Sequence, residues 1–293
     1  MIALAMAASV IFLFANAASR EQKKAECDKV KENIEFLPGT RNPLKWPFSR
    51  HSIWNMPIGS NANYVHAQIE QAQAKGMTVD EDIIVMESDA ATTGIYGNNA
   101  GWDRNKDRCI VEGGLLFEAP VPEDFVVRPG NWDGVTPNSG LAVLMPDGRT
   151  IKQTQPFARC EAGKQATSKY LFDDQDIYGQ GMYGAHGGSV LSAIGGALRL
   201  GELRPDSGPI HHALKVNLFA AKNLYYDGET KGYRWPAKRA DGYAEGNYGS
   251  YRTNPEVKEC RMGALLALPS SWNLDSIGFE TEPARILAET FQK

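Results

Sequence analysis

The sequence predicts a mainly β protein, a β-sandwich or jelly roll with two or three peripheral helices and an N-terminal apolar helix. Short apolar runs are joined by turn-rich links along most of the chain. The 293 residues include 29 Gly, 16 Pro, 6 Trp, 11 Tyr and 11 Phe, a supply that suits strands and tight turns. With 42 % hydrophobic and 23 % charged residues, the composition is that of a globular protein with a sizeable core.

Residues 1–19 are expected to form a signal peptide or a membrane anchor. Residues 2–19 carry no charge, and Ala15-Asn16-Ala17 fits the small-x-small pattern of a cleavage site. Basic residues follow the apolar run rather than precede it, so we expect an exported protein whose true start lies upstream. Alternatively, an uncleaved helix would anchor the chain with its domain in the cytoplasm, although 18 residues are near the lower limit for a span. We expect a secreted or cell-surface protein that meets a membrane only through residues 2–19, if these stay uncleaved.

The rest of the chain is expected to consist of a stalk and one domain. Residues 20–41 are polar and then proline-rich, which indicates a polar helix or stalk and a linker. Residues 42–293 are expected to form a single β-rich globular domain, truncated at the C-terminus. Within it we expect a helix over 63–75, strands over 82–86, 114–121, 124–127, 169–174 and 211–219, a hairpin over 141–155 turning at Pro146-Asp147-Gly148, and a helix over 282–293.

Charge and cysteine spacing exclude some classes of site. The net charge of −4 gives no basic patch, so we expect no nucleic-acid partner. The four cysteines are far apart, with no C-x-x-C pair, which argues against zinc. Their even number favours disulfides in an exported protein, and three pairings remain open. The alternative is four buried thiols.

A glycine-rich stretch spells G-x-G-x-x-G at Gly179, Gly181 and Gly184. A dinucleotide site needs an apolar strand before this turn and a helix after it. Here aspartates precede it and more glycines follow, so we expect no nucleotide cofactor. The acidic strings 103–107 and 173–176 could hold calcium, but solvated loop acids explain them better. We therefore assign no metal ligand and no cofactor.

The same stretch supplies candidate catalytic residues. His186 is flanked by glycines, which give a core histidine few contacts and allow a ligand to approach closely. His186, Tyr183 and Asp176 form a workable acid–base set, with Tyr178 as a flanking substrate contact. A structural turn is the alternative.

Further candidates come from an expected strand and from an aromatic segment. Alternation over 211–219 places His212 toward the core, whereas His211 and Asn217 share a polar face that suits a glycan groove or plain solvent. Residues 232–252 combine five tyrosines and Trp235 with basic residues such as Lys238, a mixture suited to an acidic polysaccharide or to a surface loop without a partner. Arg159 and Asn217 are candidates to neutralise a uronate carboxylate.

Four strings resemble a family of exported bacterial proteins. They are FSRHSIWNMPI (48–58), GGALRLGELRPDSGPIHHAL (195–214), YRWPAKRADG (233–242) and EPARILAETFQK (282–293), in that order. Relatives carry patterns similar to F-S-x-x-S-x-W-N-x-P-I and to G-G-x-(I/L)-R-x-x-E-(L/I) followed by H-A-(L/I). The resemblance implies a secreted, carbohydrate-active β-sandwich protein, makes Glu202 and His212 candidates, and implies that the last helix continues beyond this chain. His211 is an additional histidine before the matching His212.

These observations lead to two functional hypotheses. The first is an exported enzyme that acts on an extracellular, acidic polysaccharide. As a lyase it would use His186 and Tyr183 for proton transfer; as a hydrolase it would pair carboxylates from the group around Asp176 with Glu202. The alternative is a non-catalytic glycan-binding or structural protein of the cell surface.

Overall fold

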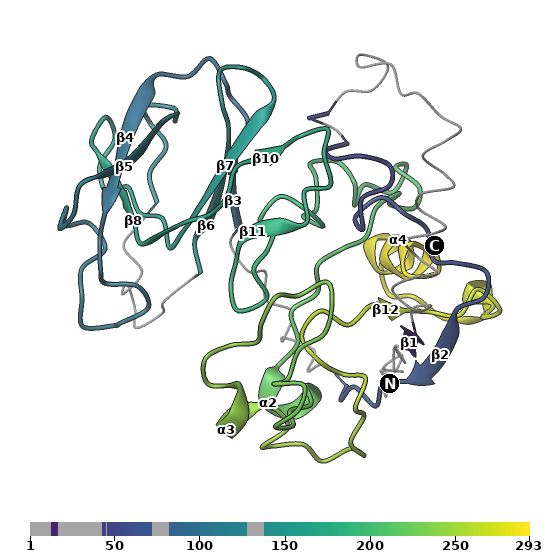
Figure 1. The fold of residues 1–293 in the computed structure, drawn as a ribbon. Coiled ribbons are helices and arrows are strands. Elements are labelled where there is room, and N and C mark those ends of the chain that lie inside the picture. The colour runs from purple at the N-terminus through teal and green to yellow at the C-terminus, as the bar shows by residue number, and fades with distance from the viewer. Residues whose placement is uncertain (1–12, 17–42, 45, 72–81, 128–137) are drawn as a thin grey trace, which may run out of the picture. The chain divides into compact units, whose positions relative to one another are not determined.

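The computed structural model describes residues 13–16, 43–44, 46–71, 82–127 and 138–293. These residues form a mainly β protein with mixed sheets and three short or medium α-helices among the described segments (Figure 1). This confirms the predicted mainly β class, whereas the β-sandwich stays a prediction. The expected stalk over 20–41 lies outside the described residues, and so does most of the expected N-terminal helix. Residues 13–16 of that segment form a strand.

The chain divides into two compact units. Unit 1 comprises Met1–Pro38, Asn55–Met77 and Leu198–Lys293, and unit 2 comprises Gly39–Trp54 and Thr78–Ala197. The single domain expected over 42–293 stays a prediction, because two compact groups of contacts can still unfold as one domain.

Unit 2 contains two sheets. One has the order β10-β7-β6-β3, with β9 also paired to β7, and the other has the order β5-β4-β8. Pairs β3–β6 and β4–β8 are parallel and the other pairs are antiparallel. The strands are β3 (Asp82–Val85), β4 (Thr92–Gly97), β5 (Leu115–Pro120), β6 (Gly140–Leu144), β7 (Thr150–Gln155), β8 (Ala166–Ser168), β9 (Tyr170–Leu171) and β10 (Gln175–Asp176).

Both sheets contribute to one apolar core. Ile95 and Phe117 from β4 and β5 pack in the same cluster as Leu141 and Val143 from β6. Every residue of β6 is buried, as expected for a central strand covered on both faces. The predicted hairpin over 141–155 is confirmed, and Gly148 takes the positive φ that its turn requires.

Unit 1 has less regular structure. Its three-stranded antiparallel sheet has the order β12-β1-β2. Its described residues include three small apolar clusters. The elements are β1 (Leu13–Asn16), β2 (Asn63–His66), α2 (Ala220–Asn223), α3 (Ala244–Asn247), β12 (Leu266–Ala267), the 3-10 turn η2 (Leu274–Ser276) and α4 (Glu282–Thr290).

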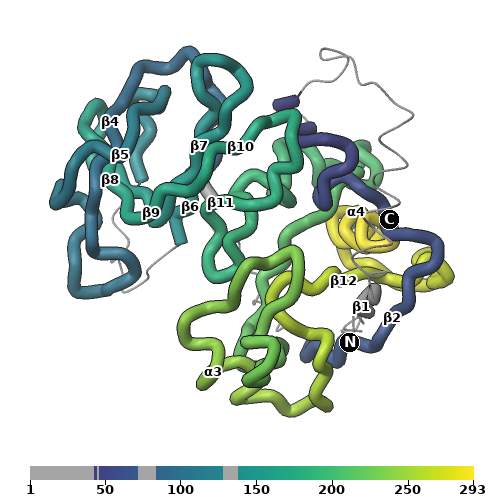
Figure 2. The backbone as a smooth tube through the Cα atoms, in the orientation of Figure 1, coloured from purple at the N-terminus to yellow at the C-terminus, as the bar shows by residue number. Residues whose placement is uncertain are grey.

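Some predicted elements are confirmed and others are wrong. The strands over 82–86 and 114–121 and the C-terminal helix are confirmed, and the helix begins at a Thr281 cap. The helix expected over 63–75 begins instead as strand β2, because it pairs with β1. No strand forms over 211–219, an irregular stretch that can be followed in Figure 2. Residues 124–127 form only one isolated bridge, from Val127 to Arg159.

One disulfide joins Cys109 to Cys160 in unit 2, with a Cα–Cα distance of 5.9 Å. Cys260 is a free, buried thiol, and burial raises its pKa to about 12. Cys27 lies outside the described residues. Among the described residues, no helix has the length and apolar character needed to cross a membrane.

Candidate functional site

The glycine-rich stretch packs around the segment 48–54. The indole Nε1 of Trp54 donates to the Gly181 carbonyl at 2.7 Å, and the Phe48 amide donates to the Ile177 carbonyl at 2.6 Å. Two strings that are far apart in the sequence therefore form one local structure.

The fingerprint glycines are required by this packing. A Cβ at Gly181 would lie 2.0 Å from the Phe48 ring, and a Cβ at Gly184 would lie 2.0 Å from Oε1 of Gln153. A Cβ at Gly195 would likewise lie 2.2 Å from the nearest atom of the Trp54 indole. Close approach of backbone to buried side chains accounts for these glycines, without reference to a phosphate.

His186 and Tyr183 lie at the two ends of β11 (Tyr183–His186), which is positioned by the buried Gln153 of β7. Oε1 of Gln153 accepts from the Ala185 and Ala193 amides, and its Nε2 donates to the Tyr183 carbonyl at 3.1 Å. Both candidate side chains are half-buried. A separation of three along a strand places them on opposite faces, so the geometry does not favour one shared acid–base site. Their catalytic role stays a prediction.

Asp176 is held in an ion pair at the sheet edge. Nη2 of Arg149 lies 2.6 Å from its carboxylate, and the Arg149 guanidinium lies 5.8 Å from the Tyr178 ring centroid. Burial alone would raise the pKa of Asp176, but hydrogen bonds from Arg149 and from the Tyr178 amide outweigh it and lower the pKa. An ionised, paired carboxylate suits a structural role better than general acid catalysis.

The acidic string 173–176 also shows no metal site. Asp174 accepts from Nζ of Lys152 at 2.8 Å, so Asp174 and Asp176 each pair with a basic residue in strand β7 or directly before it. Across the described ranges, no three His, Cys, Asp or Glu side chains gather as metal ligands would. Asp176 belongs to unit 2 and Glu202 to unit 1, and their role as a hydrolase pair stays a prediction.

Arg159 is a structural residue in this arrangement. It is 3 % exposed, and its guanidinium donates to the main-chain carbonyls of Lys164 and Pro122 at 2.9 and 2.6 Å. The side chain therefore presents almost no surface to a substrate carboxylate. The predicted carboxylate-binding role finds no support in this geometry.

Glu202 and His212 form a hydrogen-bonded pair in unit 1. Nε2 of His212 lies 2.9 Å from Oε1 of Glu202, and Nδ1 lies 2.9 Å from the Ala213 carbonyl. The Arg199 amide donates to the other carboxylate oxygen at 2.7 Å. Burial would raise the pKa of Glu202, but the His212 and Arg199 contacts outweigh it and lower the pKa.

Arg199, Glu202 and His212, all from the string 195–214, thus lie close together. The His212 ring is buried and both of its nitrogens lie against oxygen atoms of the chain, so neither nitrogen is presented to a substrate. We conclude that Glu202 and His212 tie down the loop 198–212. His211 and Asn217 are exposed in irregular chain, and the polar strand face expected for them does not form.

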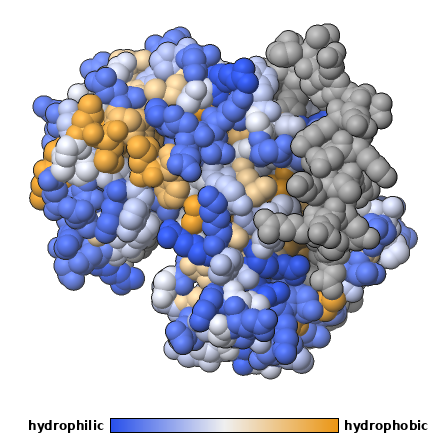
Figure 3. Space-filling model, viewed as in Figure 1, coloured by the Kyte–Doolittle hydropathy of each residue, from blue (hydrophilic) through white to orange (hydrophobic). Residues whose placement is uncertain are grey.

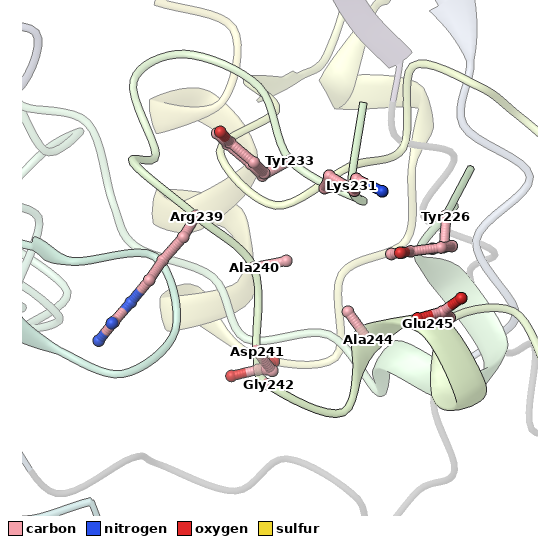
Figure 4. A pocket seen from close by; sticks show the side chains of 9 residues that line it. All are labelled: Tyr226, Lys231, Tyr233, Arg239, Ala240, Asp241, Gly242, Ala244 and Glu245. Atoms are coloured by element: carbon pink, nitrogen blue, oxygen red, sulfur yellow. The ribbon is translucent and has the colours of Figure 1, made fainter. Parts of the chain in front are cut away.

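The aromatic and basic segment borders a small pocket of about 220 Å³. Figure 4 shows Tyr226 and Tyr233 on two sides of it, with Arg239 extending away. Its volume is below the roughly 300–1,000 Å³ of typical ligand sites. Neither Trp235 nor Lys238 lines the pocket, although both are exposed. Its lining residues are Tyr226, Lys231, Tyr233, Arg239, Ala240, Asp241, Gly242, Ala244 and Glu245.

An aromatic platform lies in unit 2 at residues that the sequence did not single out. Trp102 and Tyr170 are 36 % and 44 % exposed, and their rings lie 6.0 Å apart at 22° between planes. Nζ of Lys169 lies 5.4 Å from the Tyr170 ring centroid, and we call these three residues the Trp102 platform.

The loop that carries Trp102 is held by contacts on both sides. Nδ2 of Asn98 donates to the Asp107 and Ile110 carbonyls at 2.9 and 2.7 Å. Nε of the buried Arg108 donates to the Gly101 carbonyl at 2.8 Å, and Cys109 is bonded to Cys160. Trp102 is thus presented on a pre-organised loop. In the sequence, Trp102 stands in a polar, turn-rich string that ends at Cys109.

Comparison of the chain with models of known protein families, with curated proteins and with solved structures finds no match.

Proposed function

We propose that this protein is an extracytoplasmic carbohydrate-binding protein and that the Trp102 platform is its binding surface. The observation that carries the proposal is the pair of exposed, nearly parallel rings of Trp102 and Tyr170. The two rings stack on each other, and their solvent-exposed apolar surface can pack against the C–H face of a sugar unit. The rigid loop beneath Trp102 reduces the conformational entropy lost on binding.

The surroundings of the platform support the same function. Lys169 supplies a cation for an acidic sugar, and its Nζ also donates to the Asn99 carbonyl at 3.4 Å. Leu115 and Leu171 of β5 and β9 are also exposed, and Figure 3 shows hydrophobic residues gathered over the part of unit 2 that carries β4, β5 and β8. We infer that the two sheets of unit 2 form a sandwich whose surface carries this site.

The disulfide supports an extracytoplasmic location. A bond between Cys109 and Cys160 persists in oxidising compartments and is rare in the cytosol. An uncharged segment such as residues 2–19 would direct the chain there.

The proposal is tested by calorimetric titration of the full chain with neutral and uronate-containing oligosaccharides. We expect Trp102→Ala and Tyr170→Ala each to weaken binding about tenfold, which corresponds to about 1.4 kcal/mol for one lost stacking contact. Tyr251→Ala is the matched control, because Tyr251 is 68 % exposed and lies in unit 1. Binding that is absent in the wild type, or equal in all variants, would contradict the proposal. Release of new reducing ends or of unsaturated uronates would favour the enzyme hypothesis instead.

A further inference from the structure

Two arginines of unit 1 are brought together by a short backbone pairing. Tyr233 and Met262 form a parallel bridge, in which the Arg234 amide donates to the Met262 carbonyl at 2.9 Å and the Met262 amide donates to the Gly232 carbonyl at 3.0 Å. Paired residues point to the same face and their chain neighbours to the other. Arg234 follows Tyr233 and Arg261 precedes Met262, so the two arginines share a face.

The opposite face of this pairing is already occupied. Tyr233 lines the small pocket, and Met262 packs against the apolar cluster around Leu224 and Tyr248. The face that carries Arg234 and Arg261 is therefore distinct from both the pocket and the core. Both arginine side chains are half-exposed, so a solute can reach them.

Neither guanidinium has a partner within the described part of the chain. Arg234 and Arg261 make no side-chain hydrogen bond, ion pair or ring contact there, and Nε of Arg261 is buried without an acceptor. A buried donor with no acceptor costs folding free energy. Most other basic residues with reduced exposure in this unit, such as Arg252 and Arg285, are satisfied by carbonyls or carboxylates.

The two charges also repel each other. Burial lowers the pKa of Arg234, the positive charge of Arg261 lowers it further, and Glu259 partly opposes this. Burial and the nearby Asp227 and Glu256 raise the pKa of Tyr225, and the positive charge of Arg261 partly opposes this rise. Asp227 is already engaged by Thr230, and no carboxylate of the described residues pairs with either arginine.

We propose that Arg234 and Arg261 form a binding site for an oxyanion, a carboxylate, sulfate or phosphate group of a ligand. Planar guanidinium groups match such oxygens with paired N–H donors, and an anion between them would supply the acceptor that Nε of Arg261 lacks. It would also neutralise the repulsion between the two charges. The site goes beyond the carbohydrate proposal and does not depend on the Trp102 platform.

The test is calorimetric titration of the full chain with phosphate, sulfate and glucuronate at constant ionic strength. We expect the wild type to bind at least one of these anions, and Arg234→Gln and Arg261→Gln each to weaken that binding at least tenfold. Arg239→Gln is the matched control, because Arg239 is exposed and lies in the same segment outside the pair. A preference for phosphate and sulfate over glucuronate would assign tetrahedral anions, and the reverse would assign carboxylates.

Thermal unfolding gives a second readout that a structural role would not produce. In chloride we expect Arg234→Gln and Arg261→Gln to be at least as stable as the wild type, since each relieves the repulsion, and to lose the extra stabilisation by the bound anion. Sulfate stabilises folded proteins in general, so the variants are compared at the same anion concentration. No anion binding by the wild type, or binding by both glutamine variants that is as tight as that of the wild type, would overturn the proposal.

Discussion

Gly184 has no room for a side chain, because a Cβ there would lie 2.0 Å from Oε1 of the buried Gln153. We expect Gly184→Ala to lower the free energy of unfolding by about 1–3 kcal/mol, the range for overpacking a tight interior. Urea unfolding measures this change. Gly114→Ala is the control, since no atom lies within 4 Å of a Cβ at Gly114, and it should change stability by less than about 0.5 kcal/mol. Equal effects of the two substitutions would show that the contact with Gln153 is unimportant.

Glu202 makes a pH-dependent contribution to stability. Its pKa in the folded protein lies below the usual value of 4.5, because the His212 and Arg199 contacts outweigh burial. A lowered carboxyl pKa stabilises the fold above the unfolded pKa, and this contribution is lost as the pH falls through the folded pKa. We therefore expect the wild type to lose stability more steeply than Glu202→Gln below about pH 4.5.

The comparison uses urea unfolding of both proteins at several pH values between about 3 and 7. This range extends from roughly 1.5 pH units below the usual pKa of Glu to neutral pH. Other ionised carboxylates, such as Asp176, titrate in both proteins and cancel in the difference. Parallel stability curves for the two proteins would show that Glu202 makes no such contribution.

At the scale of elements, the disulfide Cys109–Cys160 links the loop that carries Trp102 to the segment before β8. It joins residues that are 51 positions apart, and the chain-entropy model gives a stabilisation of about 4 kcal/mol for a loop of that length. We expect the double variant Cys109→Ser, Cys160→Ser to lose up to that free energy of unfolding, and to bind the oligosaccharide less tightly because the Trp102 loop is less ordered. Urea unfolding and calorimetry measure the two losses.

Reduced wild-type protein provides the control for this prediction. Treatment with dithiothreitol should reproduce both losses, and it should change nothing further in the double variant. A double variant that binds as tightly as the oxidised wild type would separate the disulfide from the proposed platform.

Elements with strong local signals could be predicted from the sequence. The hairpin over 141–155 has a Pro-Asp-Gly turn between two apolar runs, and Asp147 caps that turn by accepting from the Arg149 and Thr150 amides. The C-terminal helix has Pro283 in its first turn after the Thr281 cap. In both cases the residues that stop or start the element make their own local hydrogen bonds.

Elements that depend on distant partners could not be predicted. The apolar alternation over 211–219 resembles a strand, but none of the described segments pairs with it, and His212 contacts Glu202 instead. Residues 63–66 became a strand through pairing with Leu13–Asn16, which overrides local helix propensity. The candidate sites differ in the same way. Glu202 and His212 lie in one short string of the sequence and contact each other, so they could be singled out. Trp102 contacts Tyr170, which is distant in the sequence, so that pair could not.

At the scale of the whole molecule, the two units differ in how their apolar residues are organised. Unit 2 has one cluster that joins two sheets, together with the disulfide. The apolar clusters seen among the described residues of unit 1 are small, and long stretches of its backbone, such as 198–219, have no helix or strand until Ala220. Local stability follows buried apolar contacts and hydrogen-bonded elements, so unit 2 should be the more stable part.

Hydrogen exchange followed by mass spectrometry tests this difference in the full chain. We expect amides of β6 and β7 to exchange most slowly, through global unfolding, because β6 is fully buried and paired on both sides by β3 and β7. Amides of unit 1 should exchange faster, through openings that leave unit 2 intact, since breaking one small cluster exposes little of the other apolar surface. If the slowest amides of both units exchanged at one common rate that followed global stability, the chain would unfold as the single domain that the sequence predicts over 42–293.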